Sequence, residues 1–443
     1  MKKILIILVS VVAVIGIVVY TFQDLIFPRE EGSSSSQCYW VEDYDKDYHW
    51  EECNHCQTIK NKSEHILDEQ GECLLCSAFS GNTEFVTYEE AGNHARVVGC
   101  VNTSQKVRIL TTYNGLPVTE IAGNAFKSNS IQGVVIPKCI TTIGDFAFYE
   151  CSALSNLILP NSITAIGKSA FEGCNGLMKV EIPDSVKTLG ESAFQSCENL
   201  TDLTLSKNVE RISAFAFRWC SNLPSVEIPE GVRTLGKGAF SACYELGDIK
   251  LPDTLTTVEE EAFSMCCRNL TDLEIPDSVE VIEKKAFYHC YYLVRVNMSL
   301  GIKSLSLFAF DDCENLQYNE YGNFKYLGNG NNPYAVLVQA TNQMHENYEI
   351  HNDTKVIADY ALTSLSAFRT ITLPAGLTSI CANAFISCRN LTAVIIPKSV
   401  VYIGENVFDH CDNLTTIYCK AESLPSGWHA SWNNLNKQVV WGF

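Results

Sequence analysis

Residues 182–205 read IPDSVKTLGESAFQSCENLTDLTL, and versions of this pattern recur through most of the chain. The most regular position is a phenylalanine, such as Phe194, which most often returns after 23 residues, with one step of 22 and one of 24. Leu362 takes this place in one degenerate unit, which gives twelve units in all. The phenylalanines are Phe126, Phe148, Phe171, Phe194, Phe217, Phe240, Phe263, Phe287, Phe310, Phe385 and Phe408.

A unit of this length carries a single set of apolar positions, so it buries them only by stacking on its neighbours. The pattern therefore predicts a β-rich repeat solenoid with short parallel strands. The Leu-x-x-Leu-x-Leu ending predicts a short strand, residues 190–197 predict a turn with a short helical piece, and Pro183 ends the strand. The side chains expected to point inward are Val186, Leu189, Ala193, Phe194, Cys197, Leu200, Leu203 and Leu205.

The units resemble leucine-rich repeats of the BspA-like type, which are common on bacterial surfaces. The resemblance covers nearly all of residues 83–443. Residues 112–121 (TYNGLPVTEI) are similar to the N-terminal cap of that family, and residues 421–428 (AESLPSGW) with 439–442 (VVWG) are similar to its C-terminal cap. The resemblance implies a capped leucine-rich-repeat solenoid over 83–443 that serves adhesion or recognition at the cell surface, with no catalytic residues.

Composition limits the partners. Asp and Glu total 51 against 32 Lys and Arg, which gives a formal net charge of -19. Such a chain repels phosphate backbones, so nucleic acid is not expected as a partner. Hydrophobic residues make up 46%, which is enough to build a folded core.

The N-terminus predicts a membrane anchor. Lys2 and Lys3 precede an apolar run over residues 4–20, which nearly spans a bilayer core of ~30 Å as a helix. We expect residues 1–22 to form a cytoplasmic tip and a transmembrane signal anchor, with the bulk of the chain outside. A cleaved signal peptide is the alternative, although no Ala-x-Ala-like site follows the run. Residues 23–37, which are rich in serine, predict a flexible tether.

Residues 38–80 form a small segment rich in cysteine and histidine. Cys53 and Cys56 are separated by two residues, as are Cys73 and Cys76, and 16 residues lie between the two pairs. This spacing is typical of a zinc ribbon in which four thiolates surround one structural Zn²⁺ ion and leave no open coordination position. Two disulfides in an oxidising exterior are the alternative.

A second set of cysteines stands three residues after the recurrent phenylalanine. These thiols could bridge in pairs or bind soft metals, but small buried residues that fill one slot of the repeat core explain them more simply. We expect free thiols. The set is Cys151, Cys174, Cys197, Cys220, Cys243, Cys266, Cys290, Cys313, Cys388 and Cys411.

Two groups of residues are candidates for partner binding. The coil between Phe310 and Leu362 has 29 extra residues, and its aromatic side chains could act as anchors, although packing on the next coil would also explain them. An acidic strip along the strands could set the association rate, although a solvated sheet face would also explain it. We rank the aromatic group first. The aromatic candidates are Tyr321, Phe324, Tyr326 and Tyr334, and the acidic candidates are Asp202, Glu227, Asp248 and Glu274.

No spacing of histidine, serine and cysteine indicates a nucleophile with its base, so catalysis is not predicted. The sequence favours a membrane-anchored, monomeric surface protein that binds a protein on a host or neighbouring cell. A passive component of the cell envelope is the second interpretation, and an extracellular enzyme is the third.

Overall fold

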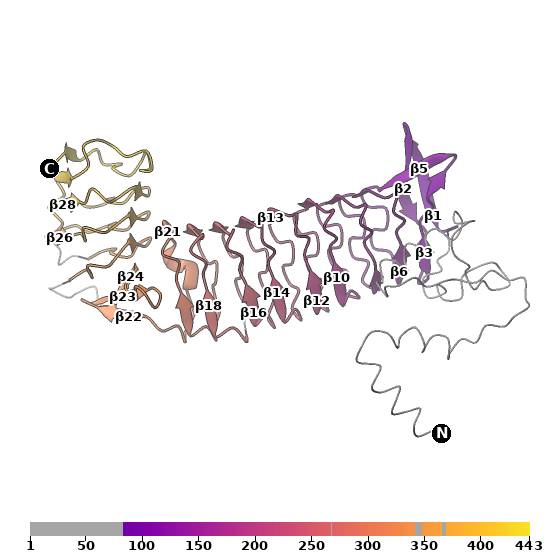
Figure 1. The fold of residues 1–443 in the computed structure, drawn as a ribbon, viewed down its shortest axis with the longest axis horizontal. Coiled ribbons are helices and arrows are strands. Elements are labelled where there is room, and N and C mark those ends of the chain that lie inside the picture. The colour runs from indigo at the N-terminus through magenta and orange to yellow at the C-terminus, as the bar shows by residue number, and fades with distance from the viewer. Residues whose placement is uncertain (1–82, 267, 342–347, 366–368) are drawn as a thin grey trace, which may run out of the picture. The chain divides into compact units, whose positions relative to one another are not determined.

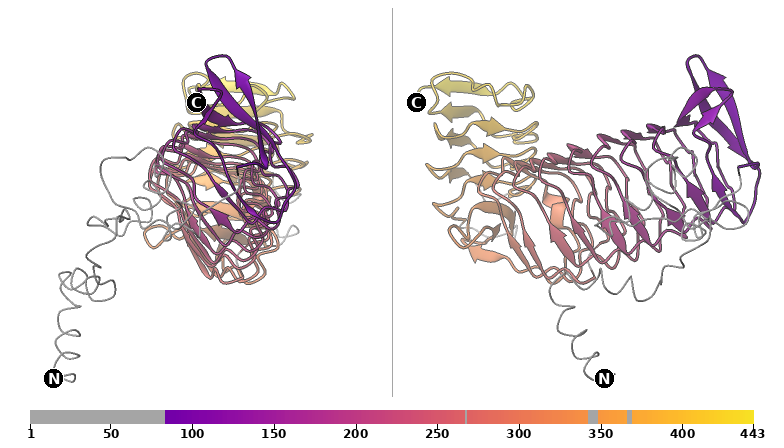
Figure 2. Two further views of the ribbon diagram at one scale, coloured as in Figure 1. Left: turned by 90° about the vertical axis from the view of Figure 1, so that its right-hand side faces the viewer. Right: turned by 45° about the vertical axis from the view of Figure 1, so that its right-hand side comes forward.

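The computed structural model describes residues 83–266, 268–341, 348–365 and 369–443. These residues belong to one compact unit, Phe79–Phe443. They form a β-solenoid of about 15 turns, in which each coil stacks on the one before it (Figure 1). Figure 2 shows the same coils from two further directions. The predicted repeat solenoid is therefore confirmed for the described residues.

Most coils contribute one strand to each of two parallel ladders that lie on different sides of the solenoid (Figure 1). Equivalent residues of successive coils pair in register, as Lys179 does with Asp202 and Thr188 with Ala165. One ladder contains β3 (Lys106–Arg108), β6 (Gly133–Val135), β8 (Asn156–Leu157), β10 (Lys179–Glu181), β12 (Asp202–Thr204), β14 (Ser225–Glu227), β16 (Asp248–Lys250), β18 (Asp272–Glu274) and β20 (Arg295–Asn297). The other contains β2 (His94–Cys100), β5 (Leu116–Ile121), β7 (Thr142–Ile143), β9 (Ala165–Ile166), β11 (Thr188–Leu189), β13 (Arg211–Ile212), β15 (Thr234–Leu235), β17 (Thr257–Val258), β19 (Val281–Ile282) and β21 (Ser304–Leu305).

Parallel ladders continue on the same two sides of the solenoid after the long coil. There β24 (Val336–Ala340), β25 (Val356–Ile357), β27 (Ser379–Ile380) and β29 (Tyr402–Ile403) form one ladder. The other ladder consists of β26 (Thr370–Thr372), β28 (Ala393–Ile396), β30 (Thr416–Cys419) and β31 (Gln438–Trp441).

The ladder that contains β10 to β20 is interrupted. β10 pairs with β12, β14 with β16, and β18 with β20, whereas within the described residues no pairing joins β8 to β10, β12 to β14 or β16 to β18. The other ladder has one such break, between β11 and β13. The burial of the inward-facing side chains reflects these gaps. Leu203 and Ile249, each on the last strand before a gap, are half-buried, whereas Val226 and Leu273 are buried.

The turn of each unit is not helical, so the predicted short helical piece is wrong. In residues 190–196 the backbone N–H groups of Ser192, Phe194 and Ser196 donate to carbonyls of the next coil at 2.9, 2.8 and 2.7 Å. Ser192 and Ser196 both have φ of 57°, in the left-handed region. Because these donors point to a neighbouring coil, they cannot form the i to i−4 bonds of a helix. Within the described residues the one helix is the 3₁₀ turn η2 (Leu307–Phe310).

The recurrent phenylalanines stack along the centre of the solenoid. From Phe126 to Phe310 successive ring centroids lie 4.7–5.7 Å apart, and Phe385 stacks on Phe408 at 5.4 Å. All of these side chains are buried. Each ring removes a large apolar surface from water and contacts equivalent rings above and below.

The recurrent cysteines line the same core as free, buried thiols, as predicted. Each described thiol of this set also donates a hydrogen bond to the carbonyl of the preceding coil's anchor residue, as Cys197 does to Phe171 at 3.3 Å and Cys174 to Phe148 at 3.1 Å. Burial raises the pKa of Cys220 to about 12, which keeps the thiol protonated and able to donate.

The ends and the long coil are built differently. At the N-terminal end β1 (Val86–Ala91) pairs antiparallel with β2, and β4 (Thr112–Tyr113) pairs antiparallel with β5. In the long coil β22 (Asn319–Tyr321), β23 (Phe324–Leu327) and β24 form an antiparallel meander. At the C-terminal end the buried Trp432 contacts Phe408 edge-on at 6.4 Å, so a tryptophan closes the phenylalanine stack.

The predicted signal anchor (1–22), tether (23–37) and zinc-ribbon-like module (38–80) lie outside the described residues. Within those residues no helix has the length and apolar character needed to cross a membrane.

Candidate recognition surface

Strand alternation sorts the side chains of the interrupted ladder. The middle residue of each three-residue strand points to the core and its two neighbours point outward. We call the outward side chains of β10 to β20 the charged face, because most of them are ionisable. They are Lys179, Glu181, Asp202, Thr204, Ser225, Glu227, Asp248, Lys250, Asp272, Glu274, Arg295 and Asn297.

Ion pairs link neighbouring coils across this face. Lys179 lies 2.6 Å from Asp202, and Lys250 lies 2.7 Å from Glu227. The hydrogen bond from Lys250 lowers the pKa of Glu227. Because these groups are well exposed, each pair contributes little to stability. Their main effect is to neutralise part of the acidic charge.

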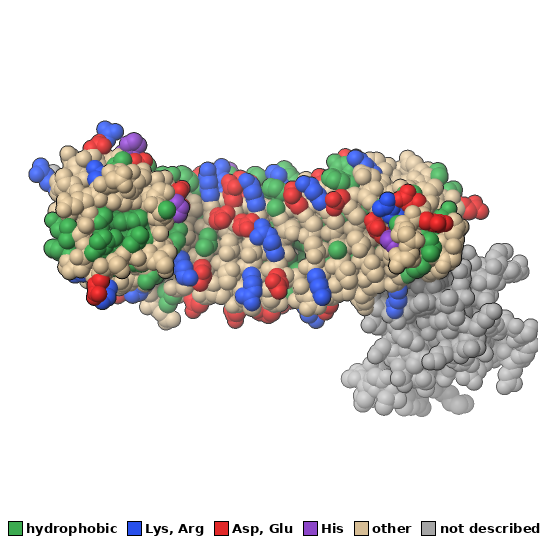
Figure 3. Space-filling model, turned by 90° about the horizontal axis from the view of Figure 1, so that it is seen from above, with side chains coloured by type: hydrophobic (Ala, Val, Ile, Leu, Met, Phe, Trp, Pro, Cys, Tyr) green, Lys and Arg blue, Asp and Glu red, His purple; other side chains and the backbone are tan. Residues whose placement is uncertain are grey.

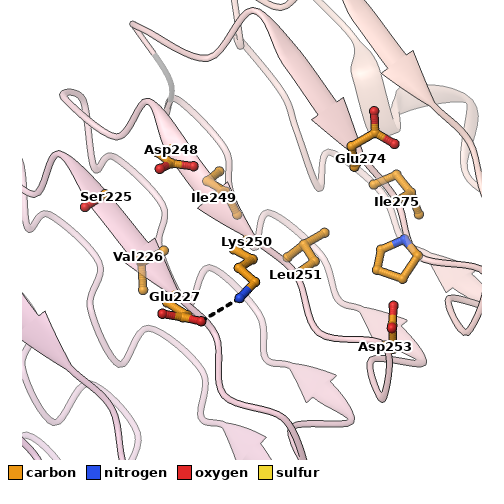
Figure 4. A pocket seen from close by; sticks show the side chains of 11 residues that line it. Ser225, Val226, Glu227, Asp248, Ile249, Lys250, Leu251, Asp253, Glu274 and Ile275 are labelled. Atoms are coloured by element: carbon orange, nitrogen blue, oxygen red, sulfur yellow. Dashed lines mark hydrogen bonds and ion pairs between the residues drawn. The ribbon is translucent and has the colours of Figure 1, made fainter.

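A cleft of about 610 Å³ opens on the charged face; it is lined by β14 and β16 and extends across the gap to β18. Figure 4 shows β16 with Asp248, Ile249 and Lys250 on one side and Glu274 on the other. We call it the β16–β18 cleft. Its lining residues are Ser225, Val226, Glu227, Asp248, Ile249, Lys250, Leu251, Asp253, Glu274, Ile275 and Pro276.

The cleft brings together three of the four acidic candidates, namely Glu227, Asp248 and Glu274. Asp202 lies on β12, outside the cleft lining. Glu227 is paired with Lys250, and Glu274 accepts a hydrogen bond from Asn297. Within the described residues no ion pair or hydrogen bond engages the carboxylate of Asp248. The cleft therefore has a net negative charge and at least one uncompensated carboxylate.

The aromatic residues of the long coil are placed differently from the prediction. Phe324 and Tyr326 are fully buried, and the Tyr326 hydroxyl accepts the backbone N–H of His351 at 3.1 Å. Tyr321 and Tyr334 are half-buried, and both rings pack on His351, at 4.8 and 4.0 Å. Burial therefore removes Phe324 and Tyr326 from any partner-binding surface, and packing of the long coil accounts for the whole group.

Several aromatic residues at the surface were missed by the sequence reasoning. Trp219 contacts Tyr244 edge-on at 5.8 Å, and the guanidinium of Arg268 lies 5.4 Å from the Tyr244 ring. Two coils further on, Tyr291 and Tyr292 are 44% and 55% exposed. The signal in the sequence is the position after the recurrent cysteine, where Tyr244 and Tyr291 replace the polar residues of other units.

No metal site is found in the part of the chain that the structure describes, where no three His, Cys, Asp or Glu side chains come together suitably. The predicted zinc ligands Cys53, Cys56, Cys73 and Cys76 lie outside it.

Comparison with known structures returns several bacterial repeat proteins. A leucine-rich repeat protein from Bacteroides ovatus is 23% identical, with a TM-score of 0.47, over 80% of this chain and 98% of that one. The T. pallidum leucine-rich repeat protein is 29% identical, with a TM-score of 0.39, over 42% of this chain and 88% of that one. A leucine-rich cell surface protein from Faecalibacterium prausnitzii is 24% identical, with a TM-score of 0.38, over 81% and 93%.

No curated protein matches the chain. The profile of the BspA type leucine-rich repeat region matches residues 119–221, 210–330 and 341–436, in six copies. Together these segments cover more than half of the chain and coincide with the stacked coils described above. The chain therefore belongs to the BspA-type leucine-rich repeat family.

Proposed function

We propose that this protein is a membrane-tethered, monomeric cell-surface protein whose repeat array recognises a protein on a host or neighbouring cell, without catalysis. Membership of the leucine-rich repeat family is consistent with protein–protein recognition. The anchor at 1–22 and the tether at 23–37 are proposed from their sequence, and they would hold the array outside the membrane.

The observation that carries the proposal is the charged face with its cleft. It is an open surface that runs over several coils, and it presents charges that the fold does not need for its core. Such a face provides both long-range attraction and a defined place for a partner to dock. Because Phe324 and Tyr326 are buried and Tyr321 and Tyr334 are half-buried against the core, we rank the charged face first as the recognition surface.

The zinc-ribbon-like module is proposed to hold one structural Zn²⁺ through Cys53, Cys56, Cys73 and Cys76. Metal analysis of the purified chain should find one zinc per molecule, and a Cys53→Ser variant should lose it. Two disulfides without zinc, in protein prepared anaerobically as well as aerobically, would contradict the assignment.

The test of recognition uses charge reversal on intact cells. A variant in which Asp202, Glu227, Asp248 and Glu274 all become lysine should lose most binding of the purified chain to partner cells. The control variant carries the same four-charge reversal at exposed carboxylates outside the three-residue strands: Glu191, Glu198, Asp312 and Glu314. Equal binding by wild type and both variants would place the binding site elsewhere. If the wild-type chain binds no cell type, the passive envelope role gains support instead.

Protease treatment of intact cells tests the topology. The repeats should be degraded while the cytoplasmic tip is protected. Survival of the repeats would overturn the proposed placement outside the membrane.

A further inference from the structure

The β16–β18 cleft has two facing strand edges that no other strand occupies. β16 and β18 are 24 residues apart, whereas β14 and β16, and also β18 and β20, are 23 apart. The extra residue lies between β17 and β18. On the opposite side of the solenoid the coils remain paired, because Thr257 of β17 pairs with Val281 of β19. The two coils are thus joined on that side. On the side of the cleft the Arg268 N–H still donates to the Tyr244 carbonyl at 3.1 Å, and the coils separate only beyond this contact, at β16 and β18.

The hydrogen bonds to the outer neighbours show which backbone groups face the cleft. Asp248 donates its N–H to Pro224, and Lys250 accepts from Ile228, so these two residues bond on the β14 side. In a parallel ladder, alternate residues bond to opposite neighbours. The backbone N–H and C=O of Ile249 therefore face the gap.

The same reasoning applies to the other wall. Thr271 of the coil that carries β18 accepts from Arg295, and Ile275 donates to Asn297, so these residues bond on the β20 side. The backbone groups of Asp272 and Glu274 are left facing the gap. Within the described residues no backbone hydrogen bond crosses from β16 to β18. Unpaired strand edges of this kind are ready to accept another strand.

A second contact shows that the separation extends beyond the strands. Asp184 and Asp277 each accept a backbone N–H from the following coil, at 2.9 and 3.0 Å. Asp253 occupies the equivalent position beside the cleft, and within the described residues nothing donates to it. Its carboxylate joins that of Asp248 as an uncompensated charge at the rim.

The floor of the cleft is apolar. Ile249 is half-buried, whereas Val226 of the preceding coil is buried. Ile275 and Leu251 also line the cleft. An occupant would therefore meet apolar side chains below, open backbone edges on both sides, and carboxylates above.

We propose that the β16–β18 cleft binds an extended peptide segment of a partner protein, in which lysine or arginine alternates with apolar residues. The segment adds a strand between β16 and β18, so that its backbone completes the interrupted ladder. Alternate side chains then point down toward Ile249 and up toward Asp248, Asp253 and Glu274, because successive side chains of a strand point to opposite faces. This inference rests on the proposed function of the charged face and names the chemistry of its ligand.

The gap between β12 and β14 provides an internal comparison. There Leu203 is half-buried, and the nearby carboxylates of Asp202 and Glu227 are both paired with lysines. Charge complementarity therefore favours the β16–β18 cleft for a cationic segment.

The test uses synthetic heptapeptides and the full-length chain in detergent micelles. The first peptide alternates valine and lysine and has blocked ends. The second replaces lysine by glutamate. The third keeps the lysines but carries N-methyl groups on alternate amides, which removes backbone donors without changing charge. Fluorescence anisotropy should detect binding of the first peptide, no binding of the second, and at least about tenfold weaker binding of the third.

Protein variants locate the site. The double variant Asp248→Lys with Glu274→Lys should weaken binding of the lysine peptide at least about tenfold, whereas the control double variant Glu191→Lys with Glu198→Lys, at exposed carboxylates outside the charged face, should leave it unchanged. Hydrogen exchange should slow in residues 247–251 and 271–275 when the lysine peptide is bound.

Three results would overturn the inference. Equal binding of the N-methylated peptide would show that attraction is electrostatic and does not involve an added strand. Equal weakening by the control variant Glu191→Lys with Glu198→Lys would show that the peptide responds to overall charge and not to the cleft. Absence of binding by every peptide would exclude this ligand, while the effect of charge reversal on cell binding would still decide the proposed function separately.

Discussion

The charged face over β10 to β20 and the corresponding face over β26 to β31 are formed by the same kind of repeat unit, yet their outward side chains differ. We call the face over β26 to β31 the apolar face, because none of its outward residues is charged and several of them are hydrophobic. Ile395 is 39% exposed there, and Tyr418 packs against Phe443 at 4.6 Å. Figure 3 views the molecule from the opposite side, that of the ladder with β13 and β21; acidic and basic side chains extend along this side as well, and hydrophobic side chains gather at the end that carries the C-terminal coils. The outward residues of this face are Thr370, Thr372, Ala393, Ile395, Thr416, Tyr418, Gln438 and Val440.

The comparison teaches that interior and exterior are under separate constraints. Both regions keep stacked phenylalanines and free thiols that donate to the preceding coil, as Cys197 does to Phe171 and Cys411 does to Phe385. The inward positions therefore determine the fold, whereas the outward positions are free to fit a partner. If this is correct, core substitutions should act alike in both regions, and surface substitutions should act differently.

The largest effect is expected from the phenylalanine stack. Phe217→Ala and Phe385→Ala should each lower the free energy of unfolding by about 3–5 kcal/mol, because each leaves a cavity and removes stacked contacts. Phe217→Leu should cost much less, since Leu362 occupies this position naturally. Urea denaturation measures the change. A large effect in one region alone would show that the two cores are not equivalent.

The second prediction concerns the pH dependence of stability caused by Asp359, which lies at the junction between the two regions. Its backbone N–H donates to Leu305 at 3.0 Å across the long coil. The pKa of Asp359 is raised to about 7, mainly by burial; a hydrogen bond from the Ala382 backbone opposes this shift, and the nearby negative charge of Glu405 adds to it. Because the folded-state pKa lies above the unfolded value, the folded state binds the proton more tightly, and stability should fall as pH rises from about 4 to about 7.

The slope contributed by this group is at most about 1.4 kcal/mol for each pH unit. Asp359→Asn should flatten this part of the stability profile and make the chain more stable at pH 8 than the wild type. Denaturation measured at pH 5 and pH 8 compares the two proteins. An unchanged profile in the variant would contradict the role of Asp359.

A smaller effect is expected from the thiols. Cys197→Ala should lower the free energy of unfolding by roughly 1–2 kcal/mol, through a small cavity and loss of the hydrogen bond to Phe171. Cys411→Ala should do the same in the C-terminal coils. Thiol reagents should label both positions of the wild-type chain only after unfolding. Disulfides between adjacent coils, detected by mass spectrometry, would contradict this account.

The smallest effect on folding is expected at the surface. Asp248→Lys on the charged face and Ile395→Lys on the apolar face should each change stability by less than about 0.5 kcal/mol. Their effects on binding should differ, because only Asp248→Lys removes a carboxylate from the β16–β18 cleft. Anisotropy with the lysine peptide checks this. Equal weakening by both variants would remove the functional distinction between the two faces.

The period of the repeat made the solenoid, its inward residues and its free thiols predictable from the sequence. The helical piece was mispredicted because local pattern does not show that Phe194 donates its N–H to the next coil. The role of Phe324 was mispredicted because aromatic content does not show which side of a strand faces the core. The β16–β18 cleft depends on the spacing of two coils, and its only trace in the sequence is the 24-residue step from Phe263 to Phe287.

The hydrogen bonds that run from the turns to the following coils also determine which gains or losses of repeat units the array can accept. Because the turns of most interior coils offer their successors the same donors and acceptors, gain or loss of one whole unit among them leaves the neighbouring contacts equivalent. A partial unit would shift the register and expose the phenylalanine stack. Changes in length should therefore occur in steps of one coil, each of which moves the β16–β18 cleft by ~4.8 Å relative to the N-terminal end of the array.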